Sequence, residues 1–144
     1  MNKVVFRNCI ENSQHWLELE KLFQNEWSDF LFVDSYKHDA NLPPVLVAIR
    51  GNQVIGGLAY SYFKEPHGDS DVIWLNALLV LPEWRGQGIA SELINRGIKQ
   101  ASNALQSHLY VYTNVPALYE SLDWSVVDIE SEPNHSVMSF PLRP

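Results

Sequence analysis

The chain has 144 residues, of which 46% are hydrophobic and 19% charged, and its formal net charge is −7. This length suits one domain over residues 1–144 with a two-layer core, and the acidic balance argues against a general nucleic-acid surface. No stretch approaches the roughly 18 consecutive apolar residues of a membrane span. Cys9 is the only cysteine, so there is no internal disulfide and no cysteine-based metal site. We therefore expect a cytoplasmic protein without a metal centre, a membrane or a nucleic acid among its partners.

The first half of the chain predicts a strand, a helix and a β-hairpin in that order. Residues 3–8 are typical of a short strand, and residues 13–27 place apolar side chains at helical spacing. The segment 28–44 is ambiguous, with a short second helix over 34–38 as one interpretation. Residues 45–50 and 54–63 alternate around a Gly51-Asn52 turn, which predicts two antiparallel strands.

The centre of the chain predicts a buried strand, a loop and a helix. Residues 72–81 are apolar nearly throughout, as in a strand covered on both faces, and Asn76 is the polar exception. A loop containing Gly86 and Gly88 follows, and apolar residues then recur at helical spacing over 89–101. The first amides of a helix lack internal partners, and glycines allow an anion to approach the backbone closely. This stretch therefore predicts a phosphate-binding loop, with an ordinary strand–loop–helix turn as the alternative.

The residues from Arg85 to Ala90 resemble the Q/R-x-x-G-x-G/A signature of the GCN5-related N-acetyltransferases. In that family the loop holds the pyrophosphate of acetyl-coenzyme A (acetyl-CoA), and the pantetheine arm lies along the open edge of the central strand. The cofactor-binding residues that this resemblance implies are Leu78, Leu79, Val80, Arg85, Gly86, Gln87, Gly88, Ile89 and Ala90.

The segment 113–124 resembles the closing segment of the same family. The resemblance implies that Asn114 and Tyr119 contact the cofactor and that the Tyr119 hydroxyl assists the departing thiolate. Leu118 and Leu122 are expected to face the core and to leave Tyr119 turned toward the cleft. A core tyrosine is the alternative. Asp123 stands where the family has glycine, and a left-handed turn is still expected there.

The acceptor side is less well specified by the sequence. Many family members use a glutamate on the central strand as the general base, whereas this chain has Asn76 near that place. Asparagine orients a water or an amine but takes no proton at neutral pH, so Asn76 is a catalytic candidate and water is the expected proton acceptor. The candidate substrate contacts are Trp27, Tyr60 and Trp74, with core packing as the alternative for each.

The resemblance implies a mixed α/β fold of the GNAT type. We expect a mostly antiparallel sheet of six to seven strands with a splayed strand pair, flanked by about four helices and ending in strands over 125–129 and 135–140. The implied reaction is direct transfer of the acetyl group of acetyl-CoA to a primary amine of a small molecule or peptide in a ternary complex. A non-catalytic module that senses CoA or acetyl-CoA, or binds a partner, is the alternative. The last hairpin could form a homodimer face.

Overall fold

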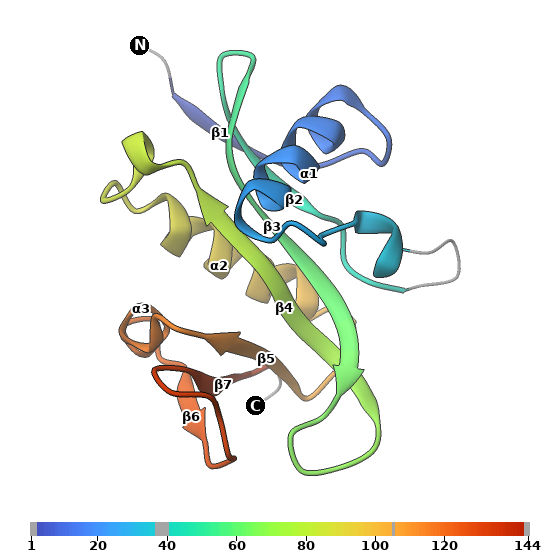
Figure 1. Ribbon diagram of the computed structural model, residues 1–144, viewed down its shortest axis with the longest axis vertical. Helices are drawn as coiled ribbons and strands as arrows, with labels where there is room; N and C mark the ends of the chain where they lie inside the picture. The colour runs from blue at the N-terminus through green and yellow to red at the C-terminus, as the bar shows by residue number, and fades with distance from the viewer. Residues whose placement is uncertain (1–2, 37–40, 105, 143–144) are drawn as a thin grey trace.

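One seven-stranded sheet with helices on both faces organises the molecule (Figure 1). The computed structural model describes residues 3–36, 41–104 and 106–142. The strands lie in the order β1-β2-β3-β4-β5-β7-β6, and every neighbouring pair is antiparallel except the parallel pair β4–β5. Their bounds are β1 Val4–Asn8, β2 Leu46–Arg50, β3 Gln53–Lys64, β4 Asp71–Val80, β5 His108–Thr113, β6 Ser125–Val127 and β7 Ser136–Pro141. The predicted mixed fold and strand number are confirmed.

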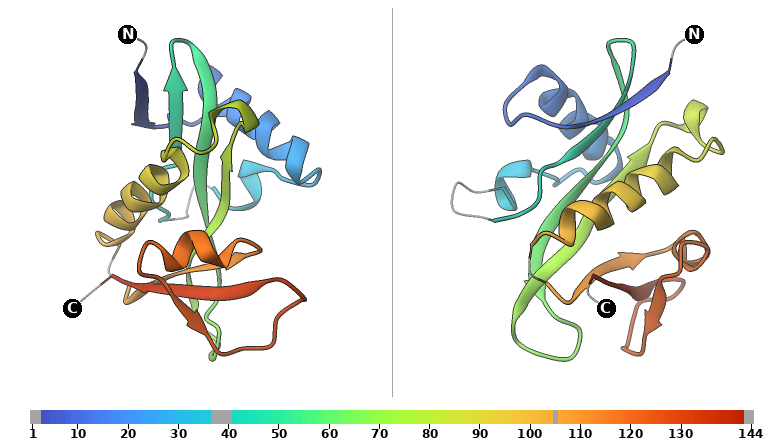
Figure 2. Two further views of the ribbon diagram at one scale, coloured as in Figure 1. Left: turned by 90° about the vertical axis from the view of Figure 1, so that its left-hand side faces the viewer. Right: turned by 180° about the vertical axis from the view of Figure 1, so that it is seen from behind.

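Two long helices cover opposite faces of this sheet, as the edge-on view shows (Figure 2). Helix α1 (Gln14–Glu26) begins where the Ser13 side chain accepts a hydrogen bond from the Trp16 amide at 3.3 Å. Helix α2 (Ile89–Ala101) buries Leu93 and Ile94 against the other face. A short helix α3 (Pro116–Glu120) and the 3-10 turns η1 (Phe32–Asp34) and η2 (Pro82–Trp84) complete the described helical segments. No helix among the described residues is long and apolar enough to cross a bilayer.

The second helix considered for residues 34–38 is replaced by η1, and residues 37–40 lie outside the described part of the chain. Phe32 anchors η1, since its ring packs against that of Trp16 with the ring centroids 4.0 Å apart. Its backbone amide also donates to Glu20 Oε2 at 2.8 Å. Aromatic packing against α1 therefore fixes this segment, and helical spacing in the sequence does not.

A β-bulge at Asn76 divides β4 into two halves. On β3, Ala59 pairs with Ala77 and Tyr60 pairs with Leu75, so Asn76 is the extra residue. An extra residue shifts the alternation of side chains by one position. Leu75 therefore faces α2 before the bulge, whereas Ala77 packs in the cluster under α1 after it. Asn76 itself is exposed.

Strands β4 and β5 diverge soon after they meet. Their pairing is limited to Trp74 with Tyr110 and Leu75 with Val111, in the middle of both strands. Beyond the bulge, the Leu81 amide donates to the Ile55 carbonyl of β3 at 2.8 Å. Because backbone groups alternate in direction along an antiparallel strand, those of residues 78 and 80 point away from β3, toward the gap. The splayed strand pair that the resemblance implied is therefore present.

Gly97 sets the distance between α2 and β3. A Cβ at Gly97 would lie 3.1 Å from both Leu58 Cδ1 and the Tyr60 hydroxyl. The Tyr60 hydroxyl also lies 2.9 Å from the Gly97 carbonyl oxygen, so the helix cannot retreat without losing this contact. We expect Gly97→Val to lower the free energy of unfolding by about 1–3 kcal/mol through overpacking. Urea denaturation checks this against Asn95→Val on the exposed face of α2; equal losses in the two variants would contradict it.

Three tyrosines are held neutral by the fold. Burial raises the pKa of Tyr36, Tyr60 and Tyr119 above the ordinary value of 10. In the unfolded chain these groups lose their protons near pH 10, while in the folded chain they keep them. We therefore expect the contribution of these three tyrosines to stability to be constant below about pH 9.5 and to fall above pH 10, by up to about 1.4 kcal/mol per pH unit for each tyrosine. Urea midpoints from pH 8 to 11 test this, and a flat profile would contradict it.

Candidate active site

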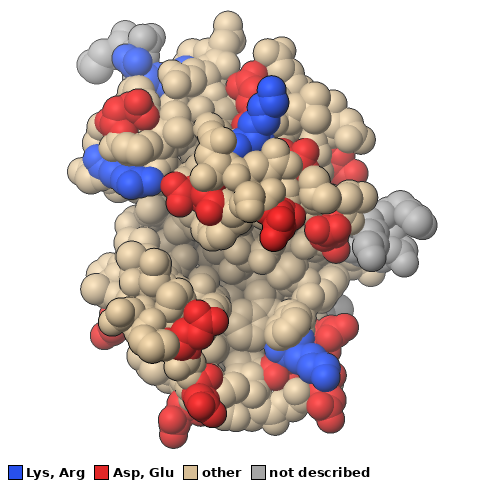
Figure 3. Space-filling model, viewed as in Figure 1, with Lys and Arg blue, Asp and Glu red and all other residues tan. Residues whose placement is uncertain are grey.

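The gap between β4 and β5 opens into a cavity of about 1080 Å³. In the space-filling view this face is hollowed between the half that carries α1 and the half that carries β5, β6 and β7, with acidic groups along its rims (Figure 3). One part of the lining comes from the strand edge, the loop and α3: Leu78, Leu79, Val80, Arg85, Ala90, Asn114, Val115, Leu118 and Tyr119. The other part comes from α1, the sheet and the segment before β7, including Glu26, Trp27, Ser61, Phe63, Trp74, Asn76, Tyr112, Ile129 and His135.

The loop before α2 presents bare backbone next to this cavity. Gly86 and Gly88 have φ angles of 78° and 80°, in the left-handed region that favours glycine. A Cβ at either position would meet no atom within 4 Å, so the volume above the backbone is open. Gly88 is also the N-cap of α2 and provides no side-chain cap, which leaves the first amides of the helix without a capping partner. The residues present therefore fit a phosphate or diphosphate group.

Arg85 connects this loop to the open strand edge. Its Nε donates to the Val80 carbonyl at 2.9 Å, and its side chain lines the cavity. This contact places a permanent positive charge where the strand gap meets the loop. Gly86, Gln87 and Gly88 are exposed beside it, whereas the Ile89 side chain turns into the core and leaves only its backbone to the loop.

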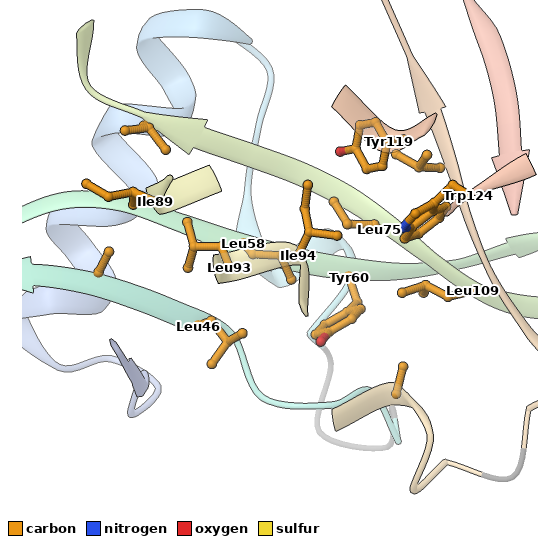
Figure 4. Packing of buried hydrophobic residues seen from close by; sticks show 14 of the residues in the cluster. Leu46, Leu58, Tyr60, Leu75, Ile89, Leu93, Ile94, Leu109, Tyr119 and Trp124 are labelled. Carbon is orange, nitrogen blue, oxygen red and sulfur yellow. The ribbon is translucent and has the colours of Figure 1, made fainter. Parts of the chain in front are cut away.

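Tyr119 lines the same cavity from α3. Its ring is only 2% exposed and packs edge-on against Trp124, with ring centroids 5.1 Å apart (Figure 4). Burial raises its pKa, so the hydroxyl stays protonated at neutral pH and can donate a hydrogen bond. The left-handed turn predicted after α3 is present, since Asp123 has a φ of 71°.

The division expected between Leu118 and Tyr119 holds in part: Leu118 packs against the core and Tyr119 reaches the cavity, but neither side chain is confined to that one place. Leu118 is half-buried and lines the cavity, while the Tyr119 ring belongs to the buried core and also reaches the cavity. Helix α3 has only five residues, so its side chains do not divide into separate inner and outer faces. The two alternatives for Tyr119, core packing and cleft lining, therefore apply to the same side chain.

The acceptor candidates separate into two groups. Trp27 is 45% exposed and lines the cavity, and Trp74 lines it while packing against Tyr110 in a tilted arrangement with a centroid distance of 5.3 Å. Tyr60, in contrast, is fully buried with its hydroxyl against α2 (Figure 4) and does not line the cavity. Strand alternation places Tyr60 on the α2 face and turns Ser61 to the cavity instead, which removes Tyr60 from the acceptor wall.

Several cavity residues were missed from the sequence alone. Phe63 follows Ser61 at strand spacing, so alternation along β3 could have identified it. Tyr112 lies on β5 and His135 directly precedes β7, and only the pairing of β5 with β7 brings the two side chains together. Among the described residues, no group of three or more His, Cys, Asp or Glu side chains could hold a metal ion.

Comparisons with known proteins agree with this architecture. The family model described as "Acetyltransferase (GNAT) family" matches residues 12–124. No curated protein matches the chain significantly by sequence. Among solved structures, the chain is similar to the GNAT family N-acetyltransferase YhbS from Escherichia coli in complex with CoA, with a TM-score of 0.73, 20% identity, and coverage of 99% of this chain and 83% of that one.

Two further solved structures share the fold. A GNAT family acetyltransferase from Brucella melitensis in complex with acetyl-CoA has a TM-score of 0.72 at 19% identity, with 99% of this chain and 90% of that chain covered. Arabidopsis thaliana Naa50, in complex with the bisubstrate analogue CoA-Ac-MVNAL, has a TM-score of 0.66 at 20% identity, with 95% and 97% covered. The family match spans most of the chain and the splayed sheet accords with it, so the chain belongs to the GNAT acetyltransferase family.

Proposed function

We propose that this protein transfers the acetyl group of acetyl-CoA directly to a primary amine in a ternary complex. The observation that carries this proposal is the continuous path from the bare loop at Gly86 and Gly88, along the unpaired edge of β4, into a cavity that reaches Tyr119. A loop fit for phosphate followed by a free strand edge matches the two chemical parts of CoA, its diphosphate and its amide-bearing pantetheine arm.

The chain's own residues take distinct roles in this proposal. Backbone amides of residues 86–90 and the Arg85 side chain hold the diphosphate, and the outward-facing backbone groups of Leu78 and Val80 hydrogen-bond the pantetheine amides. Leu79 lines the same edge, and Asn114 borders it from the end of β5. The acetyl thioester then lies near the bulge at Asn76, where freed backbone amides can polarise its carbonyl.

The Tyr119 hydroxyl donates to the thiolate that leaves when the amine attacks the thioester. Asn76, exposed at the bulge, orients the incoming amine or a water through its amide. On the acceptor side, Trp27 and Trp74 provide flat apolar walls and Glu26 provides a negative charge. Such a wall favours an amine attached to an apolar group, either on a small molecule or at the start of a peptide, the kind of group present in the analogue bound to Naa50.

A thiol-release assay tests this function. Purified protein is mixed with acetyl-CoA and a panel of apolar amines, polyamines and short peptides, and free CoA is measured together with acetylated product by mass spectrometry. We expect acceptor-dependent release of CoA with stoichiometric N-acetylation. Tight acetyl-CoA binding without turnover on any acceptor would instead support the non-catalytic sensing module.

We also propose that the protein is cytoplasmic.

We further propose that two copies form a homodimer through the β6–β7 hairpin. Strand β6 is an edge strand with three residues, and Val126 on it is 58% exposed, so both an unpaired backbone edge and an apolar side chain are available. Sedimentation of the chain and of Val126→Lys tests the dimer, which the lysine should dissociate.

A further inference from the structure

His135 stands at the end of a tight turn that is built to fix its position. Pro133 and Asn134 are the central residues of this turn, and the His135 amide donates to the Glu132 carbonyl at 3.0 Å. Asn134 has a φ of 63°, and proline followed by a left-handed residue is the pattern of a type II turn. The turn joins directly to β7, so the histidine is attached to the sheet with no flexible linker between them.

Tyr112 of β5 contacts this turn at two points. Its hydroxyl accepts a hydrogen bond from the Glu132 amide at 3.0 Å. Its ring stacks against the imidazole of His135, with centroids 5.0 Å apart and planes at 24°. Tyr112 and His135 both line the cavity. One side chain thus clamps the start of the turn and supports the ring at its end.

The hydrogen bond of the His135 ring determines which nitrogen is available. Nδ1 lies 3.0 Å from the Pro133 carbonyl oxygen. A carbonyl oxygen can only accept, so this bond requires the proton to be on Nδ1. In neutral imidazole the other nitrogen, Nε2, then carries the lone pair, and it makes no hydrogen bond to any described residue. A half-buried histidine in the cavity wall is therefore held in the tautomer of a proton acceptor.

We infer that His135 is the general base for the acceptor amine, a role that β4 leaves open because Asn76 carries no carboxylate there. This inference rests on the proposed acetyl transfer. The lone pair of the neutral amine forms the C–N bond and the C–S bond breaks with its electron pair on sulfur. The proton lost by nitrogen goes to His135 Nε2, and the sulfur gains one from Tyr119, which is reprotonated from water as His135 returns its proton to water.

The cavity wall holds other titratable groups, and two of them, both carboxylates, compete with His135 for this role. The titratable or charged side chains in the lining, besides His135, are Glu26, Lys64, Glu65, Arg85, Tyr112 and Tyr119. Tyr112 packs directly on the imidazole, and Glu132 belongs to the same turn and contacts Tyr112 through its backbone. Arginine stays protonated and a neutral tyrosine is a poor base at pH 7. The two carboxylates come from α1 and from the loop after β3, and they are the competing bases that the experiment must separate.

The experiment compares the wild type, His135→Gln and His108→Gln with an acceptor from the panel. His108 is a matched control because its ring also stacks on a β5 tyrosine, yet it does not line this cavity. We expect His135→Gln to lower kcat about 100-fold at pH 7, with the acetyl-CoA dissociation constant unchanged and His108→Gln near wild type. The dependence of kcat on pH should also differ between the wild type and His135→Gln, because the variant has lost the proposed base.

Two further measurements keep the inference testable if activity alone is ambiguous. Added imidazole should partly restore kcat in His135→Ala, which a structural role would not allow. Nitrogen-15 NMR of the wild type should show His135 protonated on Nδ1 and free on Nε2, without any turnover. Wild-type turnover with an unchanged pH profile in His135→Gln would overturn the role of His135 while leaving acetyl transfer intact. A wild type that releases no CoA with any acceptor would overturn both.

Discussion

Replacing Gly88 with aspartate is expected to weaken acetyl-CoA binding about 100-fold, equivalent to about 2.7 kcal/mol, whereas Gly88→Asn should weaken it about tenfold or less. Both residues tolerate the left-handed backbone that Gly88 adopts at a φ of 80°, so both variants should fold. Both add a Cβ to the open volume above the loop. Only aspartate adds a negative charge where the diphosphate is proposed to lie, next to the uncapped start of α2.

Isothermal titration with acetyl-CoA measures this difference, and Gly51→Asp is the control. Gly51 has a φ of 62° with open space around it, in the turn between β2 and β3. Gly51→Asp therefore introduces the same backbone strain and the same charge as Gly88→Asp, in a different place. The comparison of aspartate with asparagine isolates charge because the two side chains have nearly the same shape. Equal affinity of the two Gly88 variants would contradict diphosphate binding at this loop.

Tyr119→Phe is expected to lower kcat about 100-fold without changing the acetyl-CoA dissociation constant. Burial raises the pKa of Tyr119, so the hydroxyl is a donor across the neutral range and the missing function is a hydrogen bond or proton for the leaving sulfur. The ring itself remains packed on Trp124, and phenylalanine keeps that contact. The loss should therefore appear in the chemical step and leave folding nearly unchanged.

Single-turnover kinetics separate this effect from product release, and Tyr62→Phe serves as the control. Tyr62 is partly exposed, and its hydroxyl donates to the Asn41 carbonyl outside the cavity. A thioester with a better leaving group should lose less rate in Tyr119→Phe than acetyl-CoA does, since its thiolate needs less help. Identical losses for both thioesters, or a weakened cofactor affinity that accounts for the whole effect, would contradict the role of Tyr119.

The parts of the fold that were predictable are local in the sequence. The loop at 85–90, the apolar strand before it and the amphipathic helix after it are contiguous, and each is fixed by its own residues. The left-handed turn at Asp123 came from the resemblance, because the family has a glycine at this place and aspartate tolerates the same backbone. The splayed pair came from the resemblance alone, since no residue pattern marks where two strands stop pairing.

The parts that were not predictable depend on strand register and on contacts between distant segments. The bulge at Asn76 shifts which side chains of β4 face α2, and only the packing of α2 on one face of β3 shows that Tyr60 is buried. His135 gains its environment from Tyr112, 23 positions earlier, through the pairing of β5 with β7. A proline-asparagine turn was visible in the sequence, but nothing local indicated what the following ring would contact.

The brief contact between β4 and β5 has a mechanical consequence. Only two residue pairs join the four strands β1–β4 to the three strands β5, β7 and β6. The sheet is therefore weakly connected at this point, and its two parts can move relative to each other there. A pantetheine arm in the gap would bridge β4 and β5 and make the sheet continuous. A bound cofactor would then stiffen β5, β6 and β7 together, and slower amide hydrogen exchange should extend to β6, which does not line the cavity.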